Sequence, residues 1–190
     1  AKLEAALKQF PGRSGSDRMM EMAERLRTMI ATDRAHEAAA KPFDQMTQEE
    51  QVAELVFQLR NQTGFQSGQP GWCDIFRTRD GENASSPAAR LVKLGHAAVP
   101  ALIETLGSED YSRAVGFWRD FHFSHTVLTT GDCALSILER IAGRRFPQMK
   151  ITSSNMSKDD AVKATREDVE KWWAEAQKPK PSKPVKRKTK

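Results

Sequence analysis

The residues best suited to chemistry gather in one stretch, GFWRDFHFSHTVLTTGDC, at positions 116–133. His122 and His125 lie three positions apart, so on a helix they would share one face. Two imidazoles and a carboxylate can hold zinc or iron and leave coordination positions open. The HExxH signature of many zinc enzymes is absent from the sequence. The candidate metal ligands are His122, His125, Asp120, Asp132 and Cys133.

A second chemistry that this stretch suggests is nucleophilic catalysis, because Ser124 and Cys133 each have a histidine nearby. The sequence contains no GxSxG elbow and no glycine-rich phosphate loop. A Cys–His pair built on Cys73 or Cys133 stays open, because catalytic partners meet in space and not in sequence. A metal-binding protein or a hydrolase-type enzyme that uses this region is therefore one interpretation of the stretch.

The large aromatic side chains of the same stretch favour a structural role instead, because such groups must be covered. The two histidines would then hydrogen-bond to the backbone or to Asp132. On this interpretation the stretch is an aromatic-rich helix and turn that wedges two helical pairs together. It accounts for more of the residues, so we expect no catalytic residue, no bound metal and no cofactor. The aromatic residues are Phe117, Trp118, Phe121 and Phe123.

The positive charge of the chain belongs to its last residues. The 190 residues suffice for one domain with a hydrophobic core, and their formal net charge is +5. The segment KPKPSKPVKRKTK at 178–190 holds seven of the 30 basic residues and no acidic one. The rest of the chain has 23 basic against 25 acidic residues, a net charge near −2. We expect a disordered basic tail that attracts nucleic acid or another polyanion without sequence specificity.

The two cysteines, Cys73 and Cys133, do not form a CxxC pair, so a structural zinc site is not expected. One disulfide and two reduced thiols both stay open. No run of about 18 apolar residues exists, so we expect no membrane span. No signal peptide is visible, and the compartment stays open.

Apolar spacing predicts helices over most of the chain. A methionine-rich stripe predicts an amphipathic helix from Ser14 to about Ala40, and we interpret its apolar stripe as core packing. A short helix is expected at 1–10. Further helices are expected from Thr47 to about Gln62, from Pro87 to Leu94, from Val99 to Leu106, from Thr130 to Ala142, and after Ser157. The stripe consists of Met19, Met22, Ala23, Leu26, Met29 and Ile30.

The stretch at 63–85 lacks any periodicity and is expected to be a long ordered loop. Two of its aromatic residues, Trp72 and Phe76, would pin it to the body. No segment shows sustained alternation between hairpin turns, so no strand is expected. The fold class that follows is all-α, with about seven helices.

The segment PAARLVKLGHAAVPALIETLGS at 87–108 resembles a HEAT-type repeat. A degenerate second unit would pair SRAVGFWRDFHFSH with VLTTGDCALSILERIAGRRF at 127–146. Together with LVFQLRNQTG, QPGWCDIF and EKWWAE, these segments resemble one family of uncharacterised bacterial HEAT-like proteins over about 43–176. The resemblance implies an α-α superhelix of stacked helical pairs, often in an exported context, and no reaction.

Three parts of the chain are predicted: N-terminal helices at 1–42, a HEAT-like domain at 43–176, and the tail at 177–190. The function that these features favour is a non-catalytic protein–protein interaction scaffold. It would bind through a helix-lined concave face and the long loop. A polyanion-binding adaptor that works through its tail is a further alternative. The candidate binding-surface residues are Trp72, Phe76, Trp118, Arg119 and Trp173.

Overall fold

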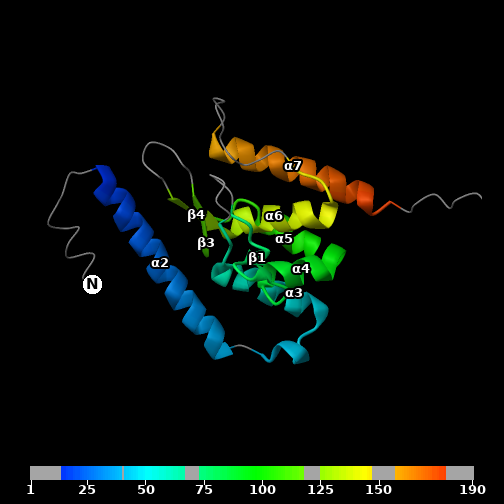
Figure 1. The fold of residues 1–190 in the computed structure, drawn as a ribbon, viewed down its shortest axis with the longest axis horizontal. Coiled ribbons are helices and arrows are strands. Elements are labelled where there is room, and N and C mark those ends of the chain that lie inside the picture. The colour runs from blue at the N-terminus through cyan, green and yellow to red at the C-terminus, as the bar shows by residue number, and fades with distance from the viewer. Residues whose placement is uncertain (1–13, 40, 67–72, 118–124, 147–156, 179–190) are drawn as a thin grey trace, which may run out of the picture.

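A long N-terminal helix lies beside a body built mainly of shorter helices (Figure 1). The structure is a computed structural model, and it describes residues 14–39, 41–66, 73–117, 125–146 and 157–178. The α-helices are α2 (Ser14–Ala39), α3 (Gln48–Phe57), α4 (Pro87–Leu94), α5 (Val99–Thr105), α6 (Thr130–Ala142) and α7 (Lys158–Ala176). Short 3-10 helices are η1 (Phe43–Gln45), η2 (Gln58–Asn61) and η3 (Gly95–Ala98). The strands are β1 (Arg77–Thr78), β2 (Gly81–Glu82), β3 (Tyr111–Phe117) and β4 (His125–Thr129).

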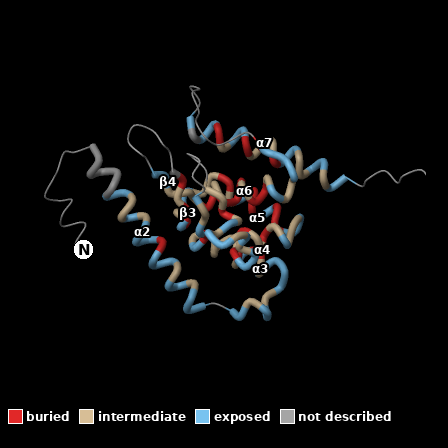
Figure 2. The backbone as a smooth tube through the Cα atoms, in the orientation of Figure 1, coloured by how far each residue is buried: buried red, intermediate tan, exposed pale blue. Residues whose placement is uncertain are grey.

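The core lies where α3, α4, α5 and α6 pack together, and Figure 2 shows buried residues concentrated there. Each of these helices turns one apolar face inward, as three-and-four spacing predicts. Leu55, Leu91 and Leu102 bring α3, α4 and α5 into this core, and each is at most 1% exposed. Leu138 of α6 is fully buried among them. The α7 helix packs beside α5 and adds the buried Val169.

Local capping fixes where the core helices begin and end. Thr47 and Glu50 form a capping box at the start of α3, in which each side chain accepts from the other residue's backbone N–H. Ser86 caps α4, and Pro87 takes the first helical position. Gly143 ends α6 in the left-handed conformation, with a φ of +65°. The sequence predicts each of these boundaries, and the structure confirms them.

A β-hairpin stands where we expected the first helix of a second repeat. β3 pairs antiparallel with β4, with Val115 opposite Val127. Ser112 and Ala114 of β3 are buried while the residues that flank Ala114 are not, which is the period of two of a strand. This alternation is carried by small side chains. The aromatic residues that suggested a helix fall mostly in the connection between the strands, which lies outside the described residues.

The segment at 63–85 is held by short-range pairing where the structure describes it. Phe65 and Asp74 form an isolated antiparallel bridge, and β1 pairs with β2 in a small hairpin. Phe76 is half-buried, and the Arg140 guanidinium lies over its ring at 5.0 Å from the centroid. At 63–66 and 73–85, the described parts of this segment, the chain forms turns and short strands and no helix, and these strands were not expected.

The prediction of an all-α superhelix is wrong. Two small antiparallel sheets interrupt the helices, and the described part of the chain has fewer helices than the seven expected. The repeat-like unit at 87–108 does form a helix, a turn and a helix, as α4, η3 and α5. In the described residues its expected neighbour is the β3–β4 pair followed by α6, so strands stand where the first helix of the second unit was expected.

Two expectations concern segments that the structure does not describe, namely the helix at 1–10 and the basic tail from 179 onward. A third concerns membranes. Among the described helices, none combines the length and the apolar character needed to cross a bilayer.

Gln62 is a buried amide that ties four segments of the body together. Its Nε2 donates to the carbonyls of Thr63 and Ile75 at 2.7 and 2.8 Å, and its Oε1 accepts from the Ala88 backbone N–H at 2.9 Å. The Gln62 carbonyl accepts from the backbone N–H of Arg113 at 2.9 Å. The Ala88 N–H lies in the first turn of α4, where amide donors lack a partner within the helix. Gln62, which is 1% exposed, therefore satisfies polar groups that burial would otherwise leave unpaired.

Replacing this amide with an apolar side chain of similar size tests its role. We expect Gln62→Leu to lower the free energy of unfolding by about 3 kcal/mol, because two buried backbone groups lose their partners at about 1–3 kcal/mol each. The matched control is Gln48→Leu, at an exposed position in the first turn of α3, with an expected change within about 0.5 kcal/mol. Urea unfolding measures both values. Equal effects of the two substitutions would contradict the role assigned to Gln62.

Candidate functional site

The residues predicted as metal ligands form no metal site in the described part of the chain. Asp132 caps α6, where its Oδ2 accepts from the backbone N of Thr129 at 2.8 Å and from its Oγ1 at 2.9 Å. His125 begins β4 and is exposed. His122 and Asp120 lie outside the described residues. The described residues contain no group of three or more His, Cys, Asp or Glu side chains that could hold a metal ion.

The two thiols do not have the properties of a catalytic cysteine. Burial raises the pKa of Cys133 to about 12, and it also raises the pKa of the half-buried Cys73. Because the thiolate is the nucleophilic form, a raised pKa lowers the reactive fraction of each thiol. Both cysteines are free in the structure.

Two of the predicted binding-surface residues are partly covered by neighbouring side chains. Trp173 is half-buried, with its ring edge-on to His96 at 5.2 Å and tilted against Trp172 at 6.0 Å between centroids. Phe76 lies under the Arg140 guanidinium. Both rings therefore serve the packing of the body. Trp72, Trp118 and Arg119 lie outside the described residues.

The α2 helix presents apolar side chains to solvent. Met20, Leu26 and Ile30 are 39%, 45% and 51% exposed, whereas Met29 is only 7% exposed. We call Leu26 and Ile30, which lie one turn apart, the exposed apolar face of α2. Figure 2 shows the helix mostly exposed along its length. The prediction that this stripe packs in the core is therefore wrong for Leu26 and Ile30.

The rotation of α2 about its axis explains this exposure. Arg25, Met29 and His36 contact or face the body, and their spacing of four and seven places them along one edge of the helix. Leu26 and Ile30 each follow one residue later, which is about 100° further around the helix. The polar contacts of Arg25 and His36 thus set the rotation of α2 about its axis, and this rotation leaves Leu26 and Ile30 uncovered.

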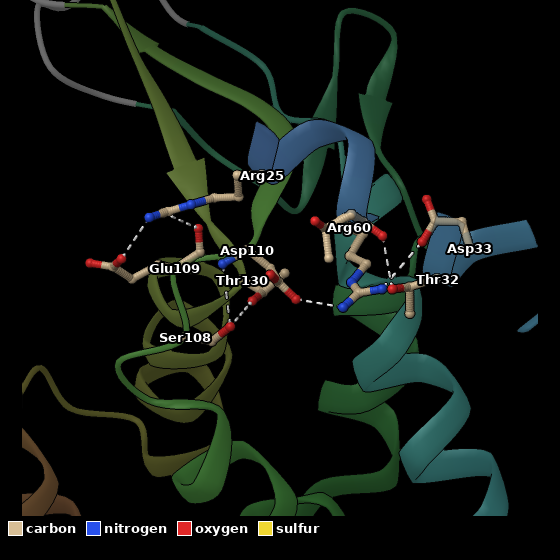
Figure 3. Close-up of polar contacts among 9 residues, drawn as sticks. Arg25, Thr32, Asp33, Arg60, Ser108, Glu109, Asp110 and Thr130 are labelled. Atoms are coloured by element: carbon tan, nitrogen blue, oxygen red, sulfur yellow. Dashed lines mark hydrogen bonds and ion pairs between the residues drawn. The ribbon is translucent and has the colours of Figure 1, made fainter. Parts of the chain in front are cut away.

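Arg25 makes the first contact between α2 and the body (Figure 3). Its Nη1 donates to the Glu109 carbonyl at 3.1 Å, and its Nη2 donates to the Glu109 carboxylate at 3.0 Å. The same guanidinium lies over the ring of Tyr111, 5.5 Å from its centroid. One arginine of α2 therefore reaches both the turn before β3 and the first residue of that strand.

Arg60 makes the second contact, because it bridges an aspartate of α2 and an aspartate of the body. Its Nη1 donates to Asp33 at 3.3 Å, and its Nη2 donates to Asp110 at 2.5 Å (Figure 3). The guanidinium also lies 4.5 Å from the ring centroid of Phe57. The Arg60 side chain is only 16% exposed, so solvent screens this pair less than it screens pairs on an open surface.

The position of Asp110 is set by the start of α6. The Asp110 carbonyl accepts from the Thr130 backbone N–H at 2.8 Å, and the Thr130 hydroxyl donates to Ser108 at 2.8 Å. These bonds hold the turn at 108–110 against the body (Figure 3). Because Asp110 is held in this way, it also holds the Arg60 guanidinium that pairs with Asp33 of α2.

His36 makes the third contact, near the C-terminal end of α2. Its Nε2 lies 2.5 Å from the Glu54 carboxylate, and its ring stacks on Phe57 with 3.7 Å between centroids. Glu54 also accepts from the Gln58 side-chain amide at 2.6 Å. The Arg25–Glu109 pair lies at the surface, where an ion pair contributes only about 0–1 kcal/mol, and the more buried Arg60 and Glu54 lose part of their attraction to desolvation. These contacts therefore hold α2 more weakly than a shared apolar core would.

A hollow of about 310 Å³ lies between the turn after α5 and the first turns of α7. Its lining mixes both signs of charge, and two of the charged groups are already engaged. Glu109 pairs with Arg25, and Arg166 donates to the Leu106 carbonyl at 2.7 Å. This arrangement offers no set of groups for a defined chemistry. The lining residues are Gly107, Glu109, Asp159, Val162, Lys163 and Arg166.

Sequence reasoning missed the charged residues that join α2 to the body. They pair over separations of 18 to 84 positions, so no local motif marks them. One signal was present, because the edge of α2 that carries Met29 also carries charged residues, which a core-facing edge rarely does. The residues are Arg25, Asp33, His36, Glu54, Arg60, Glu109 and Asp110.

Comparison of the chain with protein-family models, with curated proteins and with solved structures finds no match. The resemblance to HEAT-like proteins therefore stays a prediction from the sequence.

The assignment of Asp132 as a helix cap gives a direct test against a metal-ligand role. We expect Asp132→Ala to lower the free energy of unfolding by about 1 kcal/mol, as the loss of a capping side chain does. Because the effect comes from capping, Asp132→Ser should restore part of the stability. Urea unfolding measures both variants, and elemental analysis of the purified proteins measures metal content. A stoichiometric metal that is lost in both variants would contradict the capping assignment.

Proposed function

We propose that this chain is a non-catalytic protein–protein interaction module and that its partner packs on the exposed apolar face of α2. The observation that carries the proposal is the exposure of Leu26 and Ile30, at 45% and 51%, on a long helix that is not part of the core. Apolar side chains grouped on one exposed helix mark binding sites more often than scattered ones do.

The energetics of burial support this proposal. Fully burying a leucine or isoleucine side chain contributes about 1.5–3 kcal/mol, so covering the half-exposed pair gains a substantial part of that. An amphipathic helix that lies along an apolar groove or against another helix is a common recognition mode, with anchors at three-and-four spacing. Leu26 and Ile30 have this spacing. The surface proposed from the sequence, a concave face of stacked helices with the long loop, is replaced by α2.

Site-specific photo-crosslinking tests the proposal in the organism that makes the protein. A benzoylphenylalanine at position 26 is expected to give one discrete adduct with another protein. The same group at Ala31, which is exposed and lies about 140° away around the helix, is expected to give none. Adding Ile30→Asp to the first variant should abolish the adduct, because a charge replaces an apolar anchor.

The fold must stay intact for this loss to be informative. Because Ile30 is exposed, we expect Ile30→Asp to change the free energy of unfolding by no more than about 0.5 kcal/mol. An adduct from neither position, or from both positions equally, would contradict the proposed surface.

A further inference from the structure

We infer that α2 is a strap that opens from the body and closes on it as a unit, while the body stays folded. The inference concerns the chain by itself and needs no partner. It starts from the way α2 is held, through side chains of Arg25, Asp33 and His36 that reach across to the body. Among the described apolar side chains of α2, Met29 is the buried one.

On the body side, Arg60 keeps a counterion when α2 leaves. In the closed state it is shared between Asp33 of α2 and Asp110 of the body. Opening removes Asp33, but Asp110 remains, held by the bond between its carbonyl and the Thr130 N–H. A partly buried guanidinium left without a carboxylate would strongly oppose opening. The shared arrangement avoids that penalty.

Glu54 and Glu109, the other body-side groups, also keep a hydrogen-bond partner or gain contact with water when α2 leaves. Glu54 keeps the hydrogen bond from the Gln58 amide after His36 leaves. The Glu109 side chain is 50% exposed, so water solvates its carboxylate once Arg25 withdraws. Each body-side group therefore has a second partner or direct access to water.

The α2 helix has ion pairs of its own that do not involve the body. Arg25 lies 3.8 Å from Glu21 one turn earlier, so it keeps a partner within the helix. Arg27 and Glu24 form another such pair at 3.6 Å. These pairs do not depend on the body. A helix supported from within can move as one piece.

The body end of the connection is anchored. The Lys41 ammonium donates to both oxygens of the Glu50 carboxylate at 3.0 Å, and that carboxylate belongs to the capping box of α3. From Lys41 onward the described chain is thus held to α3. Opening of α2 uncovers Met29 and leaves the core formed by α3 to α6 unchanged.

Single-molecule energy transfer tests the strap. Two dyes are attached through unnatural amino acids at Ala31, exposed on α2, and at Lys93, exposed on α4. In 50 mM NaCl the wild-type chain should give mainly one population. Raising NaCl to 1 M should increase the share of a second population at least threefold, because salt screens the ion pairs that hold α2.

Two variants separate this strap from a general effect of charge. Asp33→Asn, which removes the α2 partner of Arg60, should raise the open share at least threefold in 50 mM NaCl. Arg34→Gln, which removes an exposed charge from the same helix, should leave it unchanged. Amide exchange of α6 should be the same in all variants, since the body stays folded.

Three results would overturn the inference. One is a single population that survives 1 M NaCl and Asp33→Asn. Another is equal opening in Arg34→Gln, which would point to overall charge and not to Arg60. The last is faster exchange of α6 whenever α2 opens, which would make α2 part of the cooperative unit of the body. None of these results requires a partner, so the strap and the proposed binding surface fail independently.

Discussion

The fold depends on one buried amide, that of Gln62. Its side chain joins the end of η2, the segment before β1 and the first turn of α4, and its carbonyl joins β3. These segments meet at a residue that is 1% exposed, where water cannot replace a lost bond. Hydrogen bonds have preferred directions, whereas apolar packing is non-directional. Gln62 therefore fixes how η2, the segment before β1, the start of α4 and β3 lie relative to one another, while apolar burial supplies most of the stability.

The η2 segment that ends at Gln62 also carries Arg60, which contacts α2. Arg60 lies two residues before Gln62 in η2, so the buried amide that fixes the end of η2 also fixes the base of the guanidinium. Asp110, the body partner of Arg60, is held from the other side by the start of α6. The core thus holds Arg60 and Asp110 in place at its edge, where Arg60 also pairs with Asp33 of α2. The α2 helix itself contributes little to the core.

The sequence predicted the local features of this structure and missed the long-range ones. Capping signals at Thr47 and Ser86 lie within four residues of the helices they start, so they can be read directly. The β3–β4 hairpin was missed because its inward positions, at Ser112 and Ala114, are small and polar or weakly apolar. The spacing in α2 predicted a helix correctly but not the face that packs, because pairs such as Arg25–Glu109 set that face from 84 positions away.

The arrangement of α2 reverses the usual order of a folded domain, in which apolar side chains are covered and charges face water. Here Arg25 and His36 face the body, while Leu26 and Ile30 are about half-exposed to solvent. Had the helix been turned by about 100°, those two apolar side chains would have faced the body. Burying them within the chain would have tied α2 to the core and left nothing for another protein to cover. A polar junction forgoes that internal stability, and it leaves Leu26 and Ile30 uncovered.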